Sequence, residues 1–219
     1  MSWLKSCANR RPPMSKRYAM AIDLQLCTGC NTCSVACKQE NNLPDGVWWT
    51  QIVTVGGDGE DVPAGTYPDL RLDYLPLACQ HCANGPCIDV CPSSATTRRE
   101  DGIVMQDPSL CIGCRYCMIV CPFTSVRVVA EEQPHHAIPF PTGENPSSHR
   151  GSTVEKCTLC AHRLALGKEP ACVLACPTQA RTFGDLNDPT SPLAQRLTEQ
   201  PHFVLLDEKG TEPSVYYLT

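Results

Sequence analysis

The chain has 219 residues, among them 17 cysteines and 20 prolines, and a formal net charge of −5. An acidic chain of this kind gives no indication of a nucleic-acid partner. Only 6% of its residues are aromatic, and proline is frequent, which does not favour a large apolar core, so the cysteines are expected to hold the chain together.

So many cysteines indicate either a secreted disulfide scaffold or metal binding. Residues 1–20 are basic but contain no apolar run long enough for a signal peptide, and Arg10-Arg11 is not a convincing twin-arginine signal. No stretch approaches the ~18 apolar residues of a membrane span. We therefore expect metal binding, with no signal peptide or membrane span of the chain's own.

The cysteines form four runs of four, which leave only Cys7 outside. The runs are Cys27, Cys30, Cys33, Cys37; Cys79, Cys82, Cys87, Cys91; Cys111, Cys114, Cys117, Cys121; and Cys157, Cys160, Cys172, Cys176. The third run, with its following proline, has the spacing by which bacterial ferredoxins bind [4Fe–4S] clusters. Zinc usually takes separated pairs of cysteines, so four [4Fe–4S] clusters are the favoured prediction.

The predicted elements follow in chain order. A strand at 18–23 precedes the first run, and Val47 to Val55 reads as another strand, closed by a glycine turn at 56–59. That turn is not a nucleotide-binding fingerprint, because no helix follows it. Residues 93–105 predict a hairpin around Asp101-Gly102, between the second and third runs.

The last part of the chain gives weaker signals. Residues 131–153 are rich in Pro, His, Ser and Gly and predict a surface loop. A strand is expected after the fourth run. Beyond residue 185 we expect a short helix and then a strand from Phe203 to Leu206, packed over the clusters or a partner.

The run spacing also predicts how the ligands divide. Three cysteines at short intervals wrap one cube, while the fourth lies beyond them and reaches a different cube, so clusters come in pairs that exchange their fourth ligands. The hairpin pairs the second run with the third, and similar flanking strands pair the first with the fourth. The predicted ligand sets are set one, Cys27, Cys30, Cys33, Cys176; set two, Cys157, Cys160, Cys172, Cys37; set three, Cys79, Cys82, Cys87, Cys121; and set four, Cys111, Cys114, Cys117, Cys91.

The predicted fold class is therefore α+β and loop-rich, with two bacterial-ferredoxin-like [4Fe–4S] units, one inserted in the other. The outer unit comprises residues 16–38 and 154–190, and the inserted unit comprises 72–130. The remaining parts are a strand-containing insertion (39–71), the surface loop (131–153) and a C-terminal extension (191–219).

A family resemblance rests on four segments: Tyr18 to Cys37, QHCANGPCIDVCP, REDGIVMQDPSLCIGCRYCMIVCPF and PACVLACPTQARTFGDLNDP. Together they resemble the iron–sulfur subunit of dimethyl sulfoxide reductase-type complexes, to which polysulfide, thiosulfate, tetrathionate and arsenate reductase subunits are similar. The resemblance covers residues 16–190 and implies an electron-transfer subunit that is not catalytic on its own. It implies a large molybdenum or tungsten bis-pterin catalytic subunit as partner, and a quinone-reactive membrane anchor or another redox partner. It also supports the pairing of runs given above.

The sequence departs from some relatives, and two other functions remain as alternatives. Some relatives replace one cysteine by Trp and hold a three-iron cluster, whereas all sixteen positions are Cys here. Formate dehydrogenase and hydrogenase subunits, which often carry a C-terminal membrane helix, remain an alternative, as does a free polyferredoxin carrier. The long segments at 39–78 and 131–153 argue against a free carrier. Membrane association through partners is expected, with the side of the membrane open.

Functional and ordinary structural roles compete for one further cysteine, four histidines and two tryptophans. Cys7 reads as a free cysteine, and His135 and His136 lack the pattern of a metal site. His81 and His162 adjoin cluster ligands and are expected to tune them by hydrogen bonds. Core packing and contact with the catalytic partner are equally plausible for Trp48 and Trp49.

Overall fold

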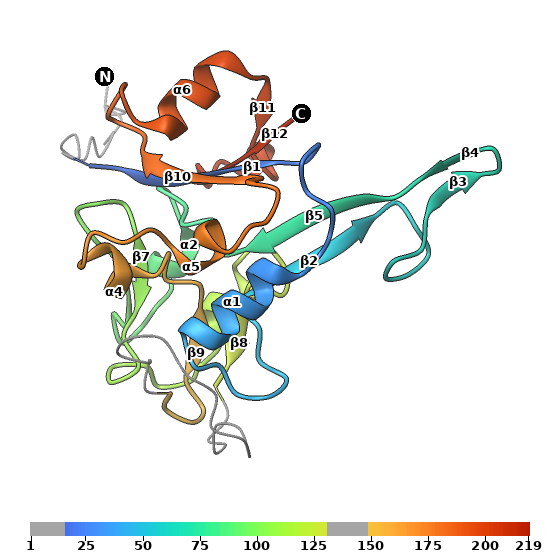
Figure 1. Ribbon diagram of the computed structural model, residues 1–219. Helices are drawn as coiled ribbons and strands as arrows, with labels where there is room; N and C mark the ends of the chain where they lie inside the picture. Colours follow the sequence, from blue (N-terminus) through green and yellow to red (C-terminus); the bar gives the residue numbers. More distant parts are fainter. Residues whose placement is uncertain (1–15, 131–148) are drawn as a thin grey trace, which may run out of the picture.

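The computed structural model describes residues 16–130 and 149–219, in which short helices and strands are separated by long loops (Figure 1). This mixed, loop-rich structure agrees with the coarse α+β prediction. Cys7, His135, His136 and most of the predicted 131–153 loop lie outside the described residues. The helices are α1 (Thr32–Glu40), α2 (Pro86–Asp89), α3 (Tyr116–Ile119), α4 (Ala161–Leu164), α5 (Ala171–Leu174) and α6 (Pro192–Glu199), with a 3-10 turn at Asp207–Lys209.

A four-stranded sheet brings the two ends of the described chain together. Its order is β10-β1-β12-β11, with β1 (Tyr18–Asp23), β10 (Arg181–Asp185), β11 (His202–Phe203) and β12 (Val215–Leu218). Strand β1 pairs antiparallel with β10 and parallel with β12. The expected strands before the first run and after the fourth run are therefore present, and they are neighbours.

Two small ladders lie around the second and third runs. The predicted hairpin is confirmed as β6 (Thr96–Arg98) paired antiparallel with β7 (Val104–Gln106). Strand β8 (Arg127–Val129), after the third run, pairs antiparallel with β9 (Val154–Lys156), directly before the fourth run. The middle of the chain is thus hydrogen-bonded to the segment that opens the fourth run.

A long β-ribbon projects from the body of the protein (Figure 1). Strands β2 (Thr50–Val55) and β5 (Asp73–Ala78) form its base, and β3 (Ala64–Thr66) and β4 (Asp69–Arg71) form its tip. The predicted strand at 47–55 is therefore three residues too long, and its partner β5 was not expected. The glycine segment after β2 bends the chain as predicted.

The apolar core is divided among several small clusters. The largest contains Met20 of β1, Ile103 beside the β6–β7 hairpin, Phe183 of β10 and Tyr217 of β12. This cluster packs the outer sheet against the middle of the chain. Cysteines are themselves core residues elsewhere, because Cys87, Cys111 and Cys117 form one cluster with Ala95 and Val154.

The C-terminal extension differs from its prediction. The expected helix is present as α6, where the hydroxyl of Ser191 caps the backbone N–H of Ala194 and Pro192 occupies the first turn. The strand expected from Phe203 to Leu206 is wrong beyond Phe203, since Leu206 adopts a left-handed φ of 51° that ends an extended chain. The main strand of the extension is β12, which packs on β1 within the protein itself.

Candidate metal centres

Glycine shapes the loops of the first and third runs. Gly29 and Gly113 each lie one residue before the second cysteine of their run, with φ of +69° and +70°. A Cβ at Gly29 would meet the Tyr74 ring at 2.6 Å, and one at Gly113 would meet the Ser152 carbonyl oxygen at 2.4 Å. Both the left-handed backbone and the lack of space therefore require glycine in these two loops.

The four cysteines of set two meet around one cavity. Cys37, at the end of the first run, lines this cavity with Cys157, Cys160 and Cys172 of the fourth run. Burial raises the pKa of Cys37 well above its usual value, and repulsion from Cys157, Cys172 and Cys160 adds to the effect. Burial likewise raises the pKa of Cys160 to about 11. A cysteine 120 residues distant in sequence from Cys157 is therefore its spatial neighbour.

Set one also joins the two ends of the chain. Burial raises the pKa of Cys27, and the charges of Cys33 and Cys176 raise it further. Cys30 is exposed, and the hydroxyl of Thr32 at 3.3 Å lowers the pKa of its thiol. The structure thus brings Cys176 of the fourth run to the first run.

Set three gathers in the middle of the chain. Burial raises the pKa of Cys82 to about 12, and Cys79, Cys87 and Cys121 contribute repulsion. Burial also raises the pKa of Cys121, with Cys79 and Cys87 as neighbouring charges. The fourth cysteine of the third run accordingly lies beside the first three of the second.

Set four mirrors this exchange. Burial raises the pKa of Cys117, and its charged neighbours include Cys111 and Cys114. Cys91, the last cysteine of the second run, packs against the apolar cluster in which Cys111 and Cys117 of the third run lie with Cys87 of the second. The backbone N–H of Val154 approaches the Cys111 sulfur at 3.5 Å, a donor that would favour a thiolate there.

Electrostatic contacts between neighbouring sets place the four sets in a row. Beyond the effect of burial, the charge of Cys33 in set one raises the pKa of Cys172 in set two. Beyond burial again, the charge of Cys79 in set three raises the pKa of Cys157 in set two. Together with burial, the charge of Cys87 in set three likewise raises the pKa of Cys117 in set four. Set two is therefore electrostatically coupled to sets one and three, and set three is coupled to set four.

The ends of this row are the most accessible points. Cys30 of set one and Cys114 of set four are the two exposed cysteines among those that the structure describes. Exposed apolar side chains flank both of them: Leu26 and Val35 lie near the first, and Ile112, Tyr116 and Ile119 near the second. The inner cysteines are buried or half-buried.

The donor chemistry fits iron–sulfur clusters. Buried thiols with raised pKa values stay protonated at neutral pH unless a metal replaces the proton, and iron–sulfur clusters are held by cysteine thiolates. Within residues 16–130 and 149–219, no three His, Cys, Asp or Glu side chains converge as the ligands of a single metal ion. The four cysteines of set two instead line one cavity, together with Cys79 of set three.

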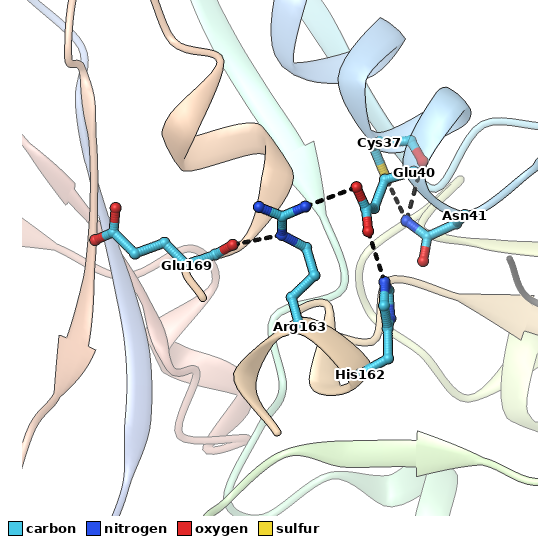
Figure 2. Close-up of polar contacts among 6 residues, drawn as sticks. All are labelled: Cys37, Glu40, Asn41, His162, Arg163 and Glu169. Carbon is cyan, nitrogen blue, oxygen red and sulfur yellow. Dashed lines mark hydrogen bonds and ion pairs between the residues drawn. The ribbon is translucent and has the colours of Figure 1, made fainter. Parts of the chain in front are cut away.

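An ion-pair network holds Cys37 toward the fourth run (Figure 2). Glu40, three residues after Cys37 on α1, lies between Arg163 Nη1 and His162 Nε2, each at 2.8 Å from one of its carboxylate oxygens. Asn41 Nδ2 donates to the Cys37 carbonyl at 3.0 Å and lies 3.6 Å from the Cys37 sulfur. These contacts attach the end of α1 to α4.

The two histidines beside predicted cluster ligands direct their hydrogen bonds to other groups than expected. His162 contacts Glu40, and Nδ1 of the fully buried His81 accepts the backbone N–H of Val104 at 3.1 Å. Burial, together with the charges of Lys156 and Arg127, holds the pKa of His81 well below its usual value, so its ring is neutral. Neither ring is hydrogen-bonded to a cysteine sulfur among the described residues.

The tryptophans contribute mainly to packing. Trp49 is buried with Cys37, Leu43 and Val47, which agrees with the core-packing alternative. The half-buried Trp48 ring lies 4.5 Å from the Lys38 ammonium, at a distance typical of a cation–π contact.

Three basic residues near the cysteines were not identified from the sequence. Arg127, Lys156 and Arg181 are all buried within the row of cysteine sets. One signal was present, since Arg127 and Arg181 each follow a Cys-Pro pair, Cys121-Pro122 and Cys176-Pro177, by a few residues.

Known proteins share this pattern. The sequence matches the family described as "4Fe-4S dicluster domain" over residues 70–138 and 135–186. It is 48% identical over 207 residues to a putative dimethyl sulfoxide reductase iron–sulfur subunit of Halobacterium salinarum, a match that covers 92% of this chain and 78% of that protein. The chain belongs to the family of iron–sulfur electron-transfer subunits of reductase complexes.

Other members of this iron–sulfur subunit family are similarly related. The arsenate respiratory reductase iron–sulfur subunit of Shewanella sp. strain ANA-3 is 37% identical over 235 residues, covering 92% of this chain and 96% of that protein. A polysulfide reductase subunit of Wolinella succinogenes is 38% identical over 204 residues, covering 93% and 94%. The predicted family resemblance is confirmed, and the family binds 4Fe–4S clusters. Of the helices in the described part of this subunit, none has the length and apolarity to cross a membrane.

Proposed function

We propose that this iron–sulfur subunit holds four [4Fe–4S] clusters and relays electrons along them between a catalytic subunit and a second redox partner. The observation that carries the proposal is the row of four cysteine sets with an exposed cysteine at each end. Each cluster, when bound, accepts and donates one electron. The chain supplies the thiolates, keeps neighbouring sites close together and excludes water from the inner ones.

The proposed ligands are the four sets predicted from the sequence. Support for each set comes from cysteines of two different runs that lie together. Cys37 lies with the fourth run, Cys176 with the first and Cys121 with the second. Cys91 packs against a cluster that contains cysteines of both the second and the third run.

The proposed architecture is one ferredoxin-like unit inserted in another. The inserted unit, residues 72–130, contains the β6–β7 hairpin between its two runs. In the outer unit, residues 16–38 and 154–190, strands β1 and β10 pair in the same antiparallel manner without a connecting turn. Strand pairing of the same kind beside both cluster pairs supports this division of the chain.

The proposed partners follow from the open ends of the row and from the relatives. Relatives are named as subunits of dimethyl sulfoxide, arsenate and polysulfide reductases, so a large molybdenum or tungsten bis-pterin subunit is proposed at one end. A quinone-reactive membrane subunit or another redox protein is proposed at the other. The exposed apolar residues around Cys30 and Cys114 provide contact surfaces for both. Membrane association through such a partner follows, on either side of the membrane, and the chain is not catalytic alone.

The proposal is tested by purifying the native assembly under anaerobic conditions. We expect the chain to run with a large subunit on gel filtration and to contain about 16 iron and about 16 acid-labile sulfide per chain, four of each per cluster. Stoichiometric zinc with iron near three or four would contradict the cluster assignment. A chain that runs alone with full iron content would instead support the polyferredoxin alternative.

A further inference from the structure

Three basic side chains are buried without an acidic partner. The exposed fractions of Arg181, Arg127 and Lys156 are 6%, 5% and 1%. Across residues 16–130 and 149–219, none of the three forms an ion pair with a carboxylate. Burying a cation without a counter-charge is strongly unfavourable, so we expect another negative group to compensate each of the three.

Arg181 lies where sets one and two meet. Its Nη2 donates to the Cys33 sulfur at 3.3 Å, and its Nη1 approaches the Met20 sulfur at 3.4 Å. The charge of Cys172, from set two, is the strongest of those acting on the guanidinium. The residue therefore faces one cysteine from each of the two sets.

Arg127 lies where sets three and four meet. Its Nη1 is 3.5 Å from the Gln106 side-chain oxygen, and its Nη2 has no hydrogen-bond partner among the described residues. Against the burial that opposes its charge, Cys79, Cys87 and Cys121 of set three and Cys117 of set four all stabilise the guanidinium. An unpartnered donor surrounded by thiols is suited to anionic sulfur.

Lys156 lies where sets two and three meet. Its ammonium donates to the carbonyl oxygens of Val104 and, at 2.9 Å, of Cys157, the first cysteine of set two. The same charge lowers the pKa of Cys87 in set three. One buried cation thus occupies each of the three junctions along the row.

We propose that Arg181, Lys156 and Arg127 set the reduction potentials of the clusters on either side of their junctions. The inference rests on the proposed four-cluster function. Each reduction adds one negative charge, and a fixed cation in a low-dielectric site stabilises the more negative form. The three residues therefore raise the potentials of the clusters that they adjoin and help to match neighbouring clusters for electron transfer.

The test is an EPR-monitored redox titration of the native complex carrying Arg127→Met, Lys156→Met or Arg181→Met. At the wild-type midpoint potential, the reduced-to-oxidised ratio of the two adjoining clusters should fall about tenfold, which is about 59 mV for a one-electron couple. Arg127→Met should affect the clusters of sets three and four. Lys156→Met should affect those of sets two and three, and Arg181→Met those of sets one and two. Unshifted potentials in loaded variants would overturn the inference.

Matched variants separate charge from packing. Arg127→Lys, Arg181→Lys and Lys156→Arg keep the charge and should keep potentials near those of the wild type. Arg71→Met removes an arginine whose side chain is 78% exposed in β4, and it should shift no potential. Where a Met variant takes up no clusters, uptake by its charge-retaining partner supports charge compensation, and failure of both overturns it. A wild-type chain without clusters would contradict the proposed function, whereas loaded but unshifted variants contradict only this inference.

Discussion

Glu40 and Arg163 join the two cysteine runs that meet at set two, through a contact of 2.8 Å between Oε2 and Nη1 (Figure 2). Glu40 is buried, and His162 contacts its other oxygen. We expect Glu40→Gln to lower the free energy of unfolding by about 1–3 kcal/mol, because a half-buried Arg163 loses its counter-charge. Urea unfolding of the loaded chain measures the change.

The same substitution should act on one cluster more than on the others. Glu40 follows Cys37 on α1, so its loss should weaken the cluster assigned to set two first. Glu199→Gln, at an exposed position of α6, is the matched control and should change neither stability nor cluster content. Equal loss of all four clusters in Glu40→Gln would contradict this local role.

Tyr217 connects the outer sheet to the projecting ribbon. Its hydroxyl donates to the Pro76 carbonyl oxygen at 2.8 Å, and the side chain is fully buried. Tyr217→Phe should cost about 1–2 kcal/mol of unfolding free energy, since it leaves a buried acceptor unsatisfied. Tyr216→Phe is the control, because the Tyr216 hydroxyl makes no hydrogen bond within the described ranges. Denaturant midpoints that fall equally in both variants would contradict the prediction.

Local signals explain what could be predicted from the sequence. The hairpin around Asp101-Gly102 and the capped helix α6 depend on neighbouring residues alone, and both are present. The cysteine spacing predicts that each run gives its fourth cysteine to another cluster, whereas the choice of partner run rests on the hairpin and the flanking strands. The coarse, loop-rich α+β fold was therefore accessible from the sequence, whereas the division of the cysteines into ligand sets stays a prediction.

Features that depend on distant residues were not predicted. Strand β5 contains Pro76, which argues against a strand, but it lies in a two-stranded ribbon where proline is tolerated. Strand β12 pairs with β1, almost the whole chain away, and no local pattern indicates that register. The roles of Arg127 and Arg181 could not be assigned either, since their burial among cysteines results from tertiary packing.

The thiols of the metal-free chain should differ in reactivity with pH. At pH 8, a thiol such as Cys82 with a pKa of about 12 has roughly a thousandfold less thiolate than an ordinary cysteine. Exposed Cys30, whose pKa is lowered by Thr32, should react with iodoacetamide first. Raising the pH toward 12 should increase labelling of Cys82 long after labelling of Cys30 has reached its plateau. Mass spectrometry of labelled peptides tests this order, and uniform labelling at pH 8 would contradict it.

The exchange of fourth ligands makes a prediction about Cys91. This residue ends the second run and packs against a cluster that contains Cys111 and Cys117 of the third run as well as Cys87 of its own. Cys91→Ala should therefore abolish or convert the cluster assigned to set four and leave set three intact, because a cube deprived of one thiolate loses iron or is destabilised.

Cys87→Ala is the matched variant for Cys91→Ala, because both cysteines belong to the second run and lie only four residues apart. Beyond the effect of burial, the charge of Cys87 raises the pKa of Cys82 and of Cys121, so Cys87 lies beside both. Its loss should therefore remove the cluster assigned to set three. EPR spectra of the two reduced variants should therefore lack different signals, and iron should fall by no more than about four per chain in each. If both variants lost the same signal, the second run would hold a single cluster with its own four cysteines, and the proposed exchange between runs would be wrong.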